Sequence, residues 1–169
     1  MTDEVGIVTS AALLTALAKR QAETAAEIYE QLTEAFVVAN NLVTAEAFRE
    51  LSEGGWRLFD AIQPLAGGLG PLPRWGETYP EISDPDSVHF LMPPYYAFEL
   101  ARRHETTTLV LLEAVAEKSA DAEIRAQAQT LLELFRPRVA AIEARRNDYP
   151  KPPHGWWIDE DGPHWESEF

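Results

Sequence analysis

Four stretches of this sequence repeat apolar residues at steps of three and four, the spacing of one face of an α-helix. They cover about residues 10–36, 44–63, 94–118 and 121–146. Only short connections join the first stretch to the second and the third to the fourth, whereas residues 64–93, rich in Pro and Gly, separate the two pairs. Short connections predict antiparallel neighbours, and a long one permits a crossover. The sequence therefore predicts an all-α, four-helix bundle of two antiparallel hairpins with one long crossover connection.

Polar residues that cap helices, and a proline that ends one, define the expected bounds. Thr9 and Ser10 precede the first helix, Thr44 precedes the second and Asp121 precedes the fourth. Side chains of these types accept hydrogen bonds from the free N–H groups of a first helical turn. Pro64 follows the second helix, and proline cannot continue a helical hydrogen-bond ladder.

The second pair of segments reads as a copy of the first. Residues 26–30 align with 109–113, and residues 48–58 align with 128–138. Such internal similarity is typical of a repeated supersecondary unit. We interpret the two pairs as two versions of one helical hairpin.

Two charged residues fall within the apolar rows of the second pair. Glu105 lies in the row of the third helix and Arg138 in the row of the fourth. A buried charge is costly unless an opposite charge accompanies it, so we expect the two to form a buried ion pair. The alternative is a rotation of both helices that lets these side chains reach water. His104 points about 100° away from Glu105 around the helix and is expected at the edge of the core.

Residues that disfavour helices lie near these charges. Gly54 and Gly55 fall in the middle of the second helix, which indicates either a close approach of another helix or a local break. Pro137 precedes Arg138 inside the fourth helix and is expected to bend its axis. A bend or a break here would leave room for a small ligand.

Two segments resemble the rubrerythrin-related proteins of the ferritin-like superfamily. They are residues 95–105, Tyr-Tyr-Ala-Phe-Glu-Leu-Ala-Arg-Arg-His-Glu, and residues 120–125, Ala-Asp-Ala-Glu-Ile-Arg. The resemblance extends over about residues 10–146 and implies a carboxylate-bridged pair of metal ions at the bundle centre. In such a site the first and third helices each provide a Glu, and the second and fourth each provide a Glu-x-x-His.

The ligand positions implied by this resemblance are mostly filled by residues that do not bind metals. Glu105 occupies the position of the third-helix Glu, but the five other positions carry Ala22, Gly55, Leu58, Phe135 and Arg138. One carboxylate beside a permanent cation does not suffice to hold a divalent ion. The resemblance thus implies a degenerate di-metal site, and the oxidase or peroxidase chemistry of the family is not expected here.

Composition excludes several classes of partner and site. The formal net charge of −14 disfavours binding to nucleic acids and to anionic membrane surfaces. No apolar run is long enough for a membrane span, and the first residues lack the basic start of a signal peptide, so we expect a cytoplasmic protein. With no cysteine in the chain, disulfides, thiolate-bound metals and a rubredoxin-type centre are excluded.

The C-terminal residues differ in composition from the rest of the chain. We expect residues 1–148 to form the helical bundle and residues 149–169 to form an irregular tail that is both acidic and aromatic. The tail aromatics Trp156, Trp157, Trp165 and Phe169 are unusual for a disordered acidic segment, which indicates docking. The bundle itself or a second copy is favoured over an outside partner, and the aromatics of the crossover offer an apolar surface: Trp75, Tyr79 and Phe90.

Metal binding has only weak candidates. These are Glu105 in the bundle and, in the tail, His154 and His164, which have acidic residues nearby. Imidazole and carboxylate suit zinc, nickel or manganese, but the spacing of these residues matches no closed metal site.

Three functional hypotheses follow. The leading one is a non-catalytic ferritin-like protein that binds or scaffolds, with no catalytic residue, no cofactor, and a homodimer as the expected assembly. The second is a metal-binding oxidoreductase that uses non-standard ligands for iron or another divalent metal. The third is a carrier of a small molecule in a pocket next to Arg138.

Overall fold

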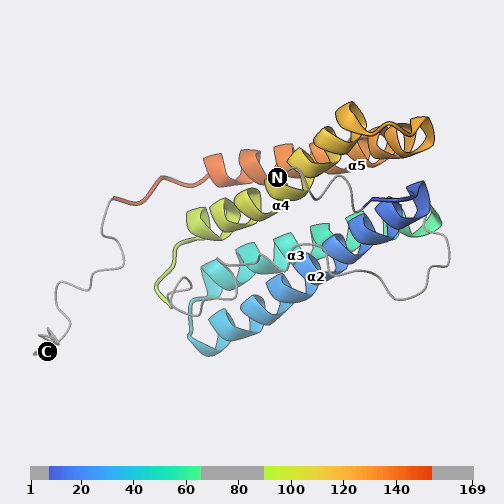
Figure 1. The fold of residues 1–169 in the computed structure, drawn as a ribbon. Helices are drawn as coiled ribbons and strands as arrows, with labels where there is room; N and C mark the ends of the chain where they lie inside the picture. Colours follow the sequence, from blue (N-terminus) through green and yellow to red (C-terminus); the bar gives the residue numbers. More distant parts are fainter. Residues whose placement is uncertain (1–7, 66–89, 154–169) are drawn as a thin grey trace, which may run out of the picture.

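The computed structural model describes residues 8–65 and 90–153, which form a bundle of helices (Figure 1). Its elements are α2 (Ala11–Val38), α3 (Leu42–Ile62), the short 3₁₀ helix η1 (Gln63–Leu65), α4 (Pro94–Lys118) and α5 (Ala122–Asn147). The helix α2 packs against α3 and α4 packs against α5, so each pair is an antiparallel hairpin. This confirms the predicted all-α bundle of two hairpins.

Contacts at the helix ends give the relative direction of the hairpins. Asn41, just before α3, donates from Nδ2 to the carbonyl oxygens of Phe90 and Met92, just before α4. At the opposite end of the bundle, Gln127 near the start of α5 donates to Thr15 near the start of α2. The helices α3 and α4 therefore begin at the same end and run in the same direction (Figure 1). The connection from α3 to α4 joins opposite ends of the bundle, as the predicted crossover requires.

Two of the predicted caps are confirmed. The side chain of Ser10 accepts a hydrogen bond from the backbone N–H of Leu13 at the start of α2. At the start of α5, Asp121 accepts from the N–H groups of Glu123 and Ile124. Each cap provides an acceptor for N–H groups that have no partner within the helix.

The cap predicted for the second helix is wrong. The helix α3 begins two residues before Thr44, and Asn41 caps it by accepting from the Thr44 N–H at 3.2 Å. Thr44 lies in the first turn of α3, and its side chain is buried. Its hydroxyl donates to the carbonyl of Met92. Thr44 thus contributes a contact between hairpins rather than the start of a helix.

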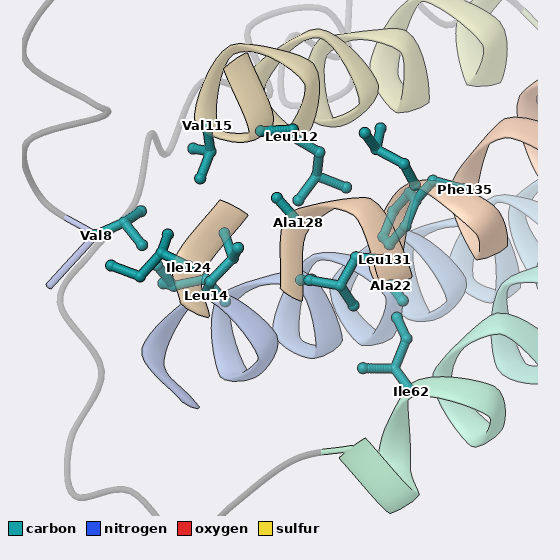
Figure 2. Close-up of a cluster of buried hydrophobic side chains, with 14 of the residues drawn as sticks. Val8, Leu14, Ala22, Ile62, Leu112, Val115, Ile124, Ala128, Leu131 and Phe135 are labelled. Atoms are coloured by element: carbon teal, nitrogen blue, oxygen red, sulfur yellow. The ribbon is translucent and has the colours of Figure 1, made fainter. Parts of the chain in front are cut away.

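The hydrophobic core consists of two clusters, one toward each end of the bundle. The first core cluster lies where α2 and α5 begin. The side chains labelled in Figure 2 all belong to it: Val8, Leu14, Ala22, Ile62, Leu112, Val115, Ile124, Ala128, Leu131 and Phe135. The second core cluster lies where α3 and α4 begin, and it includes Phe36, Phe48, Met92, Phe98 and Ile142. Each large apolar side chain that is fully buried contributes about 1.5 to 3 kcal/mol of transfer free energy.

None of the helices in the described part of the chain is both long and apolar enough to cross a membrane. Several predictions fall on residues outside the described part. They concern the crossover aromatics Trp75 and Tyr79, the tail histidines His154 and His164, and the tail aromatics Trp156, Trp157, Trp165 and Phe169.

Candidate functional site

A layer of polar groups and small residues lies between the two core clusters. All four helices contribute to it: α2 provides the hydroxyl of Tyr29, α3 the carbonyl of Leu51 and the backbone of Gly54, α4 the carboxylate of Glu105, and α5 the guanidinium of Arg138. We call these five residues the central polar layer.

The structure brings Glu105 and Arg138 together in a bidentate ion pair. Arg138 donates from Nε to Oε2 of Glu105 at 3.0 Å and from Nη2 to Oε1 at 2.9 Å. Only 6% of the Glu105 side chain and 12% of the Arg138 side chain are exposed. The two side chains therefore do not turn outward to reach water, which the sequence had left open as the alternative to a buried pair.

Further hydrogen bonds complete the layer. Arg138 Nη2 also donates to the carbonyl oxygen of Leu51 at 2.8 Å, and the hydroxyl of Tyr29 donates to Oε1 of Glu105 at 3.4 Å. Burial raises the pKa of the Glu105 carboxyl, while the charge and hydrogen bonds of Arg138 and the Tyr29 hydroxyl oppose that rise. Each of the two oppositely charged groups thus has its counter-ion and an additional hydrogen-bond partner.

Gly54 makes room for this guanidinium. A Cβ atom at position 54 would lie 2.0 Å from Nη1 of Arg138 and 3.0 Å from its Cζ. At the next residue, a Cβ on Gly55 would lie 2.9 Å from Cβ and 3.2 Å from Cα of Ala26 in α2. Since α3 runs unbroken through both glycines, the prediction of a close approach is confirmed and that of a local break is wrong.

Pro137 lies inside α5, directly before Arg138, and α5 continues past it to Asn147. The proline therefore does not end the helix. Its position places a residue without a backbone N–H beside the one charged residue that α5 contributes to the central polar layer.

A di-metal centre of the kind that the family resemblance implies does not fit these residues. Both oxygens of Glu105 accept hydrogen bonds from Arg138, a permanent cation that would repel a metal ion. The other implied ligand positions carry Ala22, Leu58 and Phe135 in the first core cluster and Gly55 against α2. Within residues 8–65 and 90–153, no three His, Cys, Asp or Glu side chains are grouped closely enough to hold a metal ion.

A second charged cluster, which the sequence patterns did not reveal, lies near the start of α4. Glu99, with 12% of its side chain exposed, accepts hydrogen bonds from Arg102, Arg103 and, across the hairpin, Arg146 of α5. The hydrogen bonds from Arg102, more than those from Arg146 and Arg103, lower the pKa of Glu99 to about 2 although burial opposes this. The spacing of Glu99 to Arg102 and Arg103 could have indicated the helix-internal pairs. The contact with Arg146 required the fold.

His104, the neighbour of Glu105, is half-buried, which confirms its predicted place at the edge of the core. Burial lowers its pKa to about 4, so this imidazole is neutral at pH 7. The structure thus separates two adjacent residues: Glu105 belongs to the central polar layer, and His104 lies at the margin of the bundle.

Comparison with known proteins supports the fold. No family model and no curated protein matches the sequence. The crystal structure of an uncharacterized conserved protein from Magnetospirillum magnetotacticum MS-1 is similar, with a TM-score of 0.62 and 28% sequence identity. The match covers 84% of this chain and 97% of the other. The two proteins therefore share a four-helix architecture over almost the whole of the solved chain.

Proposed function

We propose that this chain is a ferritin-like protein without a catalytic centre, which binds or scaffolds another molecule and uses its bundle centre for structure. One observation carries the proposal. At the level where a ferritin-like bundle would hold metal ions, the Arg138 guanidinium is held by both oxygens of Glu105 and by the Leu51 carbonyl. A fixed cation in this position stabilises the single carboxylate of the layer, so no metal is needed to neutralise it.

The rival function is a metal-dependent oxidoreductase with non-standard ligands. The full-length protein, purified after growth with iron, manganese and zinc, is to be examined by elemental analysis. We expect metal well below one atom per chain, and the same content in Glu105→Ala as in the parent. Glu113→Ala is a matched control, because Glu113 lies on the same helix but is exposed. Stoichiometric metal that disappears in Glu105→Ala and persists in Glu113→Ala would overturn the proposal.

The same preparation tests two further expectations. Native mass spectrometry is expected to give the mass of the polypeptide alone, and a small molecule that co-purifies with the parent but not with Arg138→Gln would favour the carrier function instead. Light scattering after gel filtration is expected to give a homodimer. A monomer at every concentration would contradict that assembly.

A further inference from the structure

An exposed apolar patch lies at the turn between α2 and α3. Four large aliphatic side chains on both sides of the turn are exposed: Val37, Val38, Leu42 and Val43. Val38 and Val43 are the most exposed residues of the four, at 87% and 63%. Soluble proteins seldom leave several large apolar residues together in water unless the surface contacts something.

The segment before α4 extends this patch. Asn41, inside the turn, holds the carbonyls of Phe90 and Met92, so this segment lies against the start of α3. Phe90 and Leu91 have exposed side chains there, while Met92 enters the second core cluster. We call Val37, Val38, Leu42, Val43, Phe90 and Leu91 the turn patch.

The chain leaves the bundle at the same end. Tyr149, two residues after α5, stacks on Phe98 with ring centroids 5.8 Å apart, and Phe98 belongs to the second core cluster. Figure 1 shows the end of α5 and the α2–α3 turn on the same side of the molecule. The described chain therefore ends at the same end of the bundle as the turn patch, and an extended segment as long as residues 154–169 reaches about 50 Å.

The composition of residues 154–169 suits an apolar docking surface. The segment contains Trp156, Trp157, Ile158, Trp165 and Phe169, together with five acidic residues and no Lys or Arg. Aromatic side chains bury large apolar areas when they dock on an apolar surface. Two of the tryptophans follow Pro153 within four residues. Near the exit of the chain, the exposed Lys151 provides a positive charge to which the acidic residues are attracted.

We propose that residues 154–169 of each molecule dock on the turn patch of the same molecule, with Trp156 and Trp157 as the anchoring side chains. The turn patch is then an internal docking surface for the acidic C-terminal segment. This inference does not depend on the function proposed for the bundle centre.

The absence of cysteine from the chain permits a direct test by spin labelling. One label is attached at Glu34→Cys, on the exposed surface of α2 one turn before Val38, and the other at Asp159→Cys. Double electron–electron resonance on the full-length protein is expected to give a narrow distribution of distances between the two labels. It should persist when labelled protein is diluted with unlabelled protein.

Substitutions then identify the two surfaces. Val38→Asp combined with Val43→Asp, and separately Trp156→Ala combined with Trp157→Ala, are both expected to broaden the distribution. The tryptophan variant lies outside the bundle, so it remains informative if the valine variant folds poorly. Val110→Asp changes an exposed valine of α4 and is expected to leave the distribution narrow.

Three outcomes would overturn the inference. They are a broad distribution in the parent, a narrow one that vanishes on dilution because the tail binds a second copy, and a narrow one that survives both double substitutions.

Discussion

Gly54 and Arg138 depend on each other. Glycine inside a helix destabilises it by about 1 kcal/mol relative to alanine. At position 54 the absence of a side chain leaves the space in which Nη1 of Arg138 lies, because an added Cβ would come within 2.0 Å of that atom. The buried guanidinium thus explains why a residue of low helix propensity occupies position 54.

This dependence predicts that Gly54→Ala changes the free energy of unfolding in opposite directions with and without Arg138. In the parent, Gly54→Ala is expected to reduce the free energy of unfolding by about 1 to 3 kcal/mol, because the guanidinium must leave its hydrogen bonds. In an Arg138→Ala background the same change is expected to increase that free energy by about 1 kcal/mol, because only helix propensity remains. Chemical unfolding of the four proteins measures both effects. Stabilisation in both backgrounds would show that Arg138 does not occupy this space.

His104 gives the molecule a specific sensitivity to acid. Its pKa in the folded protein is about 4, below the ordinary value of 6.5, because the half-buried imidazole resists protonation. Protonation of the unfolded chain begins first, so the contribution of His104 to stability is complete above pH 6.5 and is lost as the pH falls toward 4.

We expect the parent to lose about 2 to 3 kcal/mol more stability between pH 7 and pH 4 than His104→Asn loses. Urea unfolding at intervals of half a pH unit measures the two curves. Parallel curves across this window would contradict the lowered pKa of His104.

Residue patterns predicted part of the central polar layer. Glu105 and Arg138 stood out because each interrupts an apolar row, and rows of this kind face a common core. The roles of Gly54 and of the Leu51 carbonyl could not be predicted, because they depend on how closely α3 approaches α5. The carbonyl is moreover a backbone group that no side-chain pattern reveals.

At the scale of the elements, the start of α3 shows where sequence patterns mislead. Thr44 is a favoured cap residue, but the helix starts earlier, at an Asn41 that follows Asn40 in a left-handed conformation with φ of 58°. The Asn41 side chain also binds the segment that precedes α4. This second role involves residues about fifty positions later in the chain, so local patterns could not indicate it.

Substitution of Asn41 separates these two roles. Asn41→Ala removes the cap and both bonds to the segment before α4, and is expected to lower the free energy of unfolding by about 2 to 3 kcal/mol. Asn41→Ser retains a cap and loses only the bonds from Nδ2, so about 1 kcal/mol is expected. In both variants, hydrogen exchange at residues 90–92 should accelerate. Unchanged exchange in both would show that Asn41 does not fasten this segment.

At the scale of the whole molecule, apolar periodicity and connection lengths predicted the four long helices of the described residues, their pairing into hairpins and a connection from α3 to α4 between opposite ends of the bundle. These features follow from short-range chemistry, and the structure confirms them. The division of the core into two apolar clusters separated by the central polar layer was not predicted, because it depends on which helices face one another.

The central polar layer joins the two hairpins. Glu105 and Arg138 both belong to the α4–α5 hairpin, while their additional partners, Tyr29 and Leu51, belong to the α2–α3 hairpin. Apolar side chains alone permit several alignments of one helix pair along another. We infer that the ion pair contributes to a single alignment, since a shift of one hairpin along the other would break its buried hydrogen bonds to Tyr29 and Leu51.

A double-mutant cycle on Glu105 and Arg138 tests the account most directly. The free energies of unfolding of the parent, Glu105→Gln, Arg138→Gln and the double variant are measured by denaturant unfolding at pH 7. We predict that each single change costs about 3 to 5 kcal/mol, because it leaves an uncompensated charge in the core. The double change should cost less than the sum of the two, with a coupling free energy of about 2 kcal/mol or more. Single variants as stable as the parent, with no measurable coupling, would contradict a buried ion pair at the centre of the bundle.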